Sequence, residues 1–145
     1  MTNPAGFWVR VLASILDALI IGLPIGLIIY LLTGNMENEN LPSLLVSIYS
    51  MLLPLFWHGY TVGKRIMKVR IVKVDGSKLG IGAMLMRVFV AGLIYAVTLG
   101  IGLVVSAFMV GLRQDKRGLH DLIAGTYVTY NAPGEEADFV VNEQL

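Results

Sequence analysis

Residues 6–17 read GFWVRVLASILD, and a long apolar segment follows them. This stretch places an arginine and a carboxylate at the start of what is expected to be the first membrane-spanning helix. At about 100° per residue, Arg10, Ser14 and Asp17 fall on one stripe of an α-helix. An aspartate inside a membrane helix costs about 2.5 to 3.5 kcal/mol, so Asp17 is expected to face the protein interior.

The composition is that of a membrane protein. Of the 145 residues, 56% are hydrophobic and 14% are charged, whereas ordinary globular chains carry about 25% charged residues. The apolar stretches reach the roughly 20 residues needed to cross a bilayer. Cysteine is absent, which excludes a disulfide framework and any cysteine-based metal or redox site. The first apolar run is too long for the core of a cleavable signal peptide.

The first half is expected to contain two full transmembrane helices, over residues 7–32 and 41–57. The loop between them, residues 33–40, carries two glutamates and no lysine or arginine, whereas basic residues gather in residues 58–87. Under the positive-inside rule, the N-terminus and the basic loop are cytoplasmic and the acidic loop lies outside.

Residues 88–112 form a third apolar stretch, which Thr98, Gly100 and Gly102 interrupt. A single straight span would leave the basic residues after it outside, against the positive-inside rule. A short helical hairpin would keep the C-terminus cytoplasmic, and we favour this arrangement. The sequence leaves both alternatives open.

A small cytoplasmic β element is expected beside the helices. Residues 69–74 alternate with period two, and Asp75-Gly76 is a strong turn signal, which together predict a hairpin with residues 78–81 as the return strand. Residues 126–130 are a second candidate partner for residues 69–74.

The two halves of the chain resemble each other weakly. Residues 63–72 are echoed by residues 120–129, and Arg87 opens the third apolar stretch as Arg10 opens the first. Each half then reads as arginine, apolar hairpin, polar helical turn and strand. The predicted fold is therefore an all-α membrane protein with a small β element. It forms a single domain over residues 1–131, followed by an acidic mobile tail over residues 132–145.

Two interpretations of Asp17 stay open. In a low-dielectric site its pKa would rise, so the carboxylate could exchange a proton for a cation. Alternatively, Asp17 is the buried structural partner of an arginine, either Arg10 or Arg87. Asp121 is expected at the cytoplasmic face, within reach of either arginine. His120 beside it titrates near neutral pH and is interpreted either as a proton relay or as an ordinary hydrogen-bonded residue.

Other chemistries have little support. The two histidines lack a cluster of further ligands with metal-binding spacing, and no nucleotide-binding or nucleophile motif is present, so neither a metal, a cofactor nor an enzymatic activity is expected. A recognisable nucleic-acid fold is absent too. The nearer anion is the lipid head group, which attracts each adjacent lysine or arginine by about 1 kcal/mol. The candidate lipid-binding residues of the basic loop are Lys64, Arg65, Lys68, Arg70 and Lys73.

Three motifs resemble those of the bacterial RDD family, which is named for an arginine and two aspartates. They are G-F-W-x-R-x-x-A-x-x-x-D at residues 6–17, T-V-G-K-R-I-x-x-x-R-I-V-x-x-D-G at residues 61–76, and L-H-D-L-I-A-G-T-Y-V at residues 119–128. The resemblance covers about residues 6–130. By motif position it implies that the family residues are Arg10, Asp17 and Asp121. It also implies a small membrane protein, and exchange of monovalent cations for protons has been proposed for some members.

The sequence thus predicts a multi-pass protein of the bacterial inner membrane, built on Arg10, Asp17 and Asp121. The accessory residues expected around them are Ser14, Arg87 and His120. One prediction is monovalent cation/proton exchange at the intramembrane aspartate, which would favour a homo-oligomer because one carboxylate and short helices are a slender basis for alternating access. The alternative is a non-enzymatic membrane scaffold or accessory subunit in which the same residues form a structural clasp.

Overall fold

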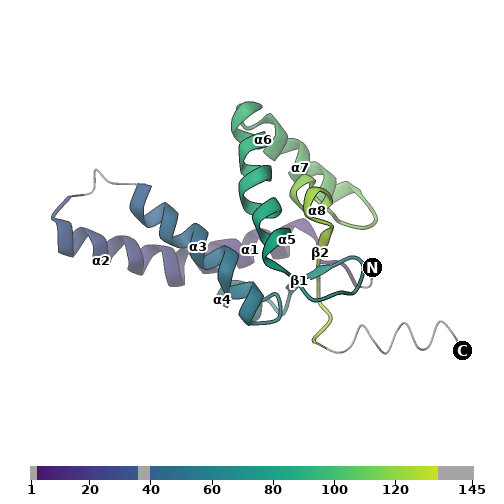
Figure 1. Ribbon diagram of the computed structural model, residues 1–145, viewed down its shortest axis with the longest axis horizontal. Coiled ribbons are helices and arrows are strands. Elements are labelled where there is room, and N and C mark those ends of the chain that lie inside the picture. The colour runs from purple at the N-terminus through teal and green to yellow at the C-terminus, as the bar shows by residue number, and fades with distance from the viewer. Residues whose placement is uncertain (1–2, 36–39, 134–145) are drawn as a thin grey trace, which may run out of the picture.

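The computed structural model describes residues 3–35 and 40–133 (Figure 1). Nearly all of the predicted acidic tail, residues 134–145, and the middle of the acidic loop, residues 36–39, lie outside the described residues.

The first helix is continuous from Phe7 to Thr33 and has three parts. It comprises α1 (Phe7–Asp17), the π-helical turn η1 (Ala18–Gly22) and α2 (Leu23–Thr33). Pro24 lacks a backbone N–H, so the carbonyl of Ile20 loses its usual helical partner, and the wider π turn lies at this position. The predicted first helix is therefore confirmed, with a π-helical turn in its middle.

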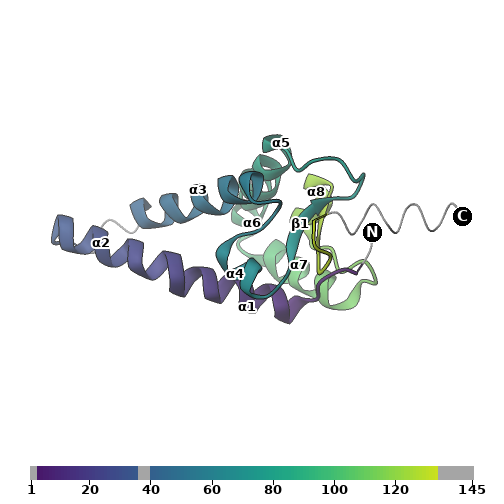
Figure 2. The ribbon, with the colours of Figure 1, turned by 90° about the horizontal axis from the view of Figure 1, so that it is seen from below.

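The second helix, α3 (Asn40–Phe56), returns along the first, and Figure 2 shows the two lying side by side. Among the described residues, one helix, residues 7–33, is long and apolar enough to cross a membrane. Most of its exposed side chains are apolar, and they include Leu19, Leu23, Leu27 and Leu31. Such a surface is unfavourable in water and suits lipid. How many of the shorter helices also cross stays a prediction.

The third apolar stretch is a helical hairpin. Its first arm is continuous from Ile81 to Val97 and comprises α5 (Ile81–Leu85), η2 (Met86–Val90) and α6 (Ala91–Val97), and its second arm is α7 (Ile101–Leu112). Leu99 and Gly100 connect the arms with φ angles of 54° and 84°. This left-handed backbone reverses the chain. The structure therefore has the hairpin and not the single straight helix.

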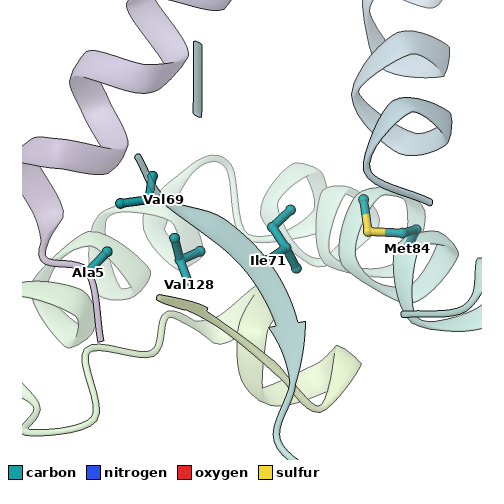
Figure 3. Close-up of a cluster of buried hydrophobic side chains, with 5 residues drawn as sticks. All are labelled: Ala5, Val69, Ile71, Met84 and Val128. Carbon is teal, nitrogen blue, oxygen red and sulfur yellow. The ribbon is translucent and has the colours of Figure 1, made fainter. Parts of the chain in front are cut away.

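A two-stranded antiparallel sheet lies where the two helical hairpins meet (Figure 1). β1 (Arg70–Lys73) pairs with β2 (Thr126–Thr129), with Ile71 opposite Val128. The predicted hairpin between residues 69–74 and 78–81 is wrong, because Asp75 and Gly76 lead into a loop and Ile81 begins a helix. The alternative pairing with residues 126–130 is confirmed. A small apolar core packs around the strands (Figure 3) and comprises Ala5, Val69, Ile71, Met84 and Val128.

The predicted internal similarity corresponds to repeated geometry. Each hairpin is followed by a short helix and a strand: α4 (Val62–Ile66) precedes β1, and α8 (Leu119–Ala124) precedes β2. The first N–H of each short helix donates to a hydroxyl 13 positions earlier, Val62 to Tyr49 and Leu119 to Ser106. Beyond each short helix, one residue has a left-handed φ, Lys68 at 58° and Gly125 at 65°. In this correspondence Lys64 occupies the place of Asp121.

Candidate functional site

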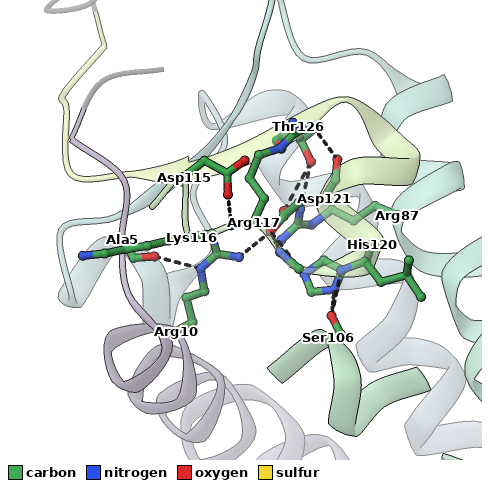
Figure 4. Close-up of polar contacts among 12 residues, drawn as sticks. Ala5, Arg10, Arg87, Ser106, Asp115, Lys116, Arg117, His120, Asp121 and Thr126 are labelled. Atoms are coloured by element: carbon green, nitrogen blue, oxygen red, sulfur yellow. Dashed lines mark hydrogen bonds and ion pairs between the residues drawn. The ribbon is translucent and has the colours of Figure 1, made fainter. Parts of the chain in front are cut away.

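Asp121 is the centre of the main polar site and is fully buried. Nη1 of Arg10 donates to its Oδ2 at 2.6 Å, and Nη1 of Arg87 forms an ion pair with its Oδ1 (Figure 4). The backbone N–H of Gly118 donates to Oδ2 at 3.0 Å, so the carboxylate also caps α8. We call Arg10, Arg87 and Asp121 the clasp, because the three residues come from α1, η2 and α8.

The two arginines of the clasp hold further parts of the chain. Arg10 donates through Nε to the carbonyl of Ala5 at 3.1 Å and through Nη2 to the carbonyl of Lys116 at 2.5 Å. Nη1 of Arg87 also donates to the hydroxyl of Thr126, at the start of β2, at 2.9 Å. The clasp therefore joins both hairpins to the sheet and to the loop before α8.

Charge keeps Asp121 ionised in this buried place. Burial alone raises the pKa of its carboxyl, but the positive charges of Arg87 and Arg10 outweigh burial and hold the pKa below its usual range. A buried carboxylate between two guanidinium groups is stable only because it is paired. Proton exchange by Asp121 near neutral pH is therefore unfavourable.

His120, next to Asp121, belongs to a neutral hydrogen-bonded cluster. Its Nδ1 lies 2.9 Å from the hydroxyl of Tyr95, which in turn donates to Ser106 at 3.1 Å. Burial lowers the pKa of the His120 imidazole to about 4, and the positive charge of Arg87 adds to this effect. The imidazole is thus neutral at physiological pH, which favours the ordinary hydrogen-bonded interpretation over the proton relay.

Asp17 lies in a second polar site, between α1 and α4. Its Oδ1 accepts hydrogen bonds from the hydroxyl of Tyr49 at 3.0 Å and from the backbone N–H of Gly63 at 2.8 Å. Its Oδ2 accepts from the hydroxyl of Thr61 at 2.6 Å. Three donors from two elements hold the carboxylate, so Asp17 anchors the start of α4 against the first helix.

Glycine at position 63 allows α4 to pack directly against the backbone of α1. A Cβ atom at this position would collide with the backbone carbonyl of Ala13 and would lie 2.9 Å from Cγ of Asp17. Such distances are too short for any side chain, so the backbones meet directly here. This role of Gly63 was not predicted from the sequence, in which Thr61-x-Gly63 at the start of a polar helical turn was the available signal.

The structure divides the predicted residues between these two sites. It brings together Arg10 and Asp121, as predicted, and adds Arg87 as the second partner. Asp17 is separate, and the expectation that an arginine partners it is corrected: its donors are two hydroxyls and an amide. Ser14, although on the same helix, is exposed while Asp17 is buried. The functional roles of all the predicted residues stay predictions.

The five basic residues predicted to bind lipid lie in different environments, and their contact with lipid stays a prediction. Arg70 is buried and donates to the carbonyls of Asn131 and His58. Arg65 lies 4.9 Å from the centre of the Tyr60 ring, Lys68 is exposed, and Nζ of Lys73 lies 3.7 Å from Oδ2 of Asp75. Lys64 alone of the five lines a cavity between α1 and α7. The predicted set of five therefore separates into different environments.

In the part of the chain that the structure describes, no group of three or more histidine, aspartate or glutamate side chains is placed to hold a metal ion.

Comparison with known proteins agrees with the three motifs. The model of the RDD family matches residues 4–125. The uncharacterized protein YckC of Bacillus subtilis (strain 168) is 54% identical over 135 residues, which cover 92% of this chain and 89% of YckC. The uncharacterized protein YxaI of the same organism is 29% identical, covering 90% of this chain and 99% of YxaI. No solved structure matches. With its apolar first helix and its match over most of its length, the chain is a member of the membrane-associated RDD family.

Proposed function

We propose that this protein is a non-enzymatic membrane scaffold or accessory subunit whose clasp holds two helical hairpins in one fixed arrangement. The observation that carries this proposal is the complete burial of Asp121 between Arg10 and Arg87. Removing one partner of a buried ion pair typically destabilises a protein by about 3–5 kcal/mol. Separating the clasp residues would therefore be costly, which favours a rigid arrangement over one that opens repeatedly.

The rival prediction is monovalent cation/proton exchange at Asp17. Both of its oxygens accept hydrogen bonds from the protein. An incoming cation would have to displace at least one donor, and each displaced donor left buried costs about 1–3 kcal/mol. Neither Asp17 nor Asp121 lines the cavity between α1 and α7. These contacts favour a structural role for both aspartates.

Ion flux in proteoliposomes separates the two functions. The full-length protein is reconstituted with a pH-sensitive dye inside the vesicles, and a sodium or potassium gradient is applied. We expect no more proton movement than in protein-free vesicles. Cation-dependent proton movement that disappears in folded Asp17→Asn protein would reject the scaffold and establish exchange.

We place the protein in the bacterial inner membrane with both termini cytoplasmic. This topology puts the clasp and the sheet at the cytoplasmic end of the first helix. The support for it is the distribution of charge: the loop between β1 and α5 and the loop between α7 and α8 both carry basic residues, whereas residues 33–40 carry none.

A further inference from the structure

An amphipathic cavity lies between α1 and α7, beside the clasp, and has a volume of about 450 Å³. One part of its lining is polar and positively charged, and consists of Arg10, Ser14, Lys64, Arg87, Ser106 and His120. The rest is apolar. A second cavity of about 600 Å³ shares Phe7, Leu103, Ala107 and Val110 with it and continues along the same two helices.

The polar part carries more positive than negative charge. Arg10 and Arg87 share the single carboxylate of Asp121, and Lys64 adds a third cation. Burial and the nearby Arg87 lower the pKa of Lys64 to about 8, which leaves its amine mostly protonated at neutral pH. Within residues 3–35 and 40–133, no acceptor lies within hydrogen-bonding distance of Nζ of Lys64. A partly buried cation without a partner is costly and favours a bound anion.

Arg87 also has N–H groups that no described protein acceptor uses. Both of its hydrogen bonds to described residues use Nη1, so Nε and Nη2 are left without a protein acceptor in that part of the chain. A guanidinium group binds phosphate oxygens through such paired N–H groups. Lys64 and the remaining face of Arg87 therefore offer the donors that a phosphate group requires.

The depth of the cavity in the membrane indicates that the phosphate belongs to a lipid head group. Trp8 is 75% exposed at the first turn of the predicted span, where aromatic rings lie at the level of lipid head groups. Arg10 follows Trp8 by two positions, which is about 3 Å along a helix axis. Arg10 thus lies at head-group depth. Beyond it the first cavity continues toward the middle of the predicted span, where Ile15, Ala18 and Leu103 give it an apolar lining that suits an acyl chain.

We propose that the groove between α1 and α7 binds one anionic phospholipid, with its phosphate against Lys64 and Arg87 and an acyl chain along Ile15, Leu103 and Ala107. This site goes beyond the scaffold function and does not depend on it. It also differs from general attraction of the basic loop to the membrane. Lys64 and Arg87 lie in a defined cavity, whereas Arg65, Lys68, Arg70, Lys73 and Lys78 do not line it.

The test measures binding of dioleoyl phosphatidylglycerol and dioleoyl phosphatidylcholine to the full-length protein in mixed detergent micelles. Three variants are compared with the wild type. Lys64→Gln removes the proposed cation. Lys78→Gln makes the same charge change at an exposed lysine outside the cavity. Ala107→Trp fills the apolar groove and keeps every charge. Inorganic phosphate serves as a competitor without an acyl chain.

We expect the wild type to prefer phosphatidylglycerol, Lys64→Gln to weaken its binding about fivefold, and Lys78→Gln to leave it unchanged. Ala107→Trp should weaken lipid binding too, which keeps the test decisive if Lys64→Gln protein does not fold. Equal losses in Lys64→Gln and Lys78→Gln would overturn the proposal in favour of nonspecific attraction. Full competition by inorganic phosphate with no effect of Ala107→Trp would overturn it in favour of a free-anion site.

Discussion

Arg10 and Asp121 are 111 positions apart in the chain, and Nη1 of Arg10 donates to Oδ2 of Asp121 at 2.6 Å. Because Arg10 belongs to α1 and Asp121 to α8, this bond joins the beginning of the first half to the end of the second. Arg87 binds the other oxygen of the same carboxylate. One buried side chain therefore holds the two halves together, in addition to the pairing of β1 with β2.

Asp121→Asn is expected to lower the free energy of unfolding by about 3–5 kcal/mol, because two buried guanidinium groups would then face a neutral amide. Unfolding of the purified protein in detergent measures this loss. Asp75→Asn is the matched control. It makes the same chemical change at an exposed turn, where the carboxylate contacts Ser77 and Lys73, and it should change stability by no more than about 1 kcal/mol. Equal stability of the Asp121→Asn and wild-type proteins would contradict the clasp.

Gly63→Ala is expected to destabilise the protein by about 1–3 kcal/mol or more, because the added methyl group collides with the backbone of α1 at Ala13. Gly92→Ala provides the comparison, since a Cβ atom there has no neighbour within 4 Å. In that helical position alanine should stabilise by up to about 1 kcal/mol. Similar melting temperatures for the two variants would show that α1 and α4 are not in direct backbone contact.

Acidification is expected to destabilise the protein through His120. Its pKa is about 4 in the folded protein and about 6.5 in an unfolded chain. Between these values the unfolded chain binds the extra proton, so stability present at pH 7 decreases as the pH falls through 6.5 towards 4. At pH 5 the loss is on the order of 2 kcal/mol.

Melting temperature against pH, from 8 to 5, checks this expectation. His120→Gln should flatten the dependence relative to the wild type. Asp121 contributes no slope in this range, because its pKa is lowered in the folded protein and its contribution is lost only below about pH 4. An unchanged slope in His120→Gln protein would contradict a buried neutral imidazole.

The second hairpin is expected not to reach the far side of the membrane. α7 has 12 residues, which is about 18 Å of helix and less than the hydrocarbon core of about 30 Å. Because the chain contains no cysteine, single cysteines report position cleanly. In intact cells, a membrane-impermeant maleimide should label Asn35→Cys but neither Leu99→Cys nor Arg113→Cys. Labelling of Leu99→Cys from outside would show that the hairpin crosses.

The sequence predicted the parts of the fold that depend on local pattern. The first helix, its partner helix and the arginine at the start of each half follow from apolar length and charge. Asp121 was expected within reach of Arg10 or Arg87, and the structure shows that it contacts both. The strand at residues 69–74 was also recognised, but the turn signal at Asp75-Gly76 indicated a local partner. Its actual partner, β2, lies some fifty residues later, and local patterns carry no information about such distant pairing.

The partners of Asp17 were missed for a related reason. From the sequence alone, an aspartate in an apolar helix is expected to pair with an arginine, since an opposite charge stabilises a buried carboxylate strongly. In the structure, two hydroxyls and a backbone N–H together donate three hydrogen bonds to the Asp17 carboxylate in place of an arginine. The first turn of α4 provides the amide, and glycine at position 63 permits the close approach of α4 to α1. The close contact of a glycine with a neighbouring helix depends on tertiary packing and cannot be read from the local sequence.

A double-mutant cycle between Arg10 and Asp121 tests the clasp most directly. The unfolding free energies of wild type, Arg10→Met, Asp121→Asn and the double variant are measured in the same detergent. The clasp predicts that each single change is strongly destabilising and that the double variant loses at least about 1.5 kcal/mol less than the sum of the two. Losses that add to within about 0.5 kcal/mol would contradict it, because the two residues would then act independently.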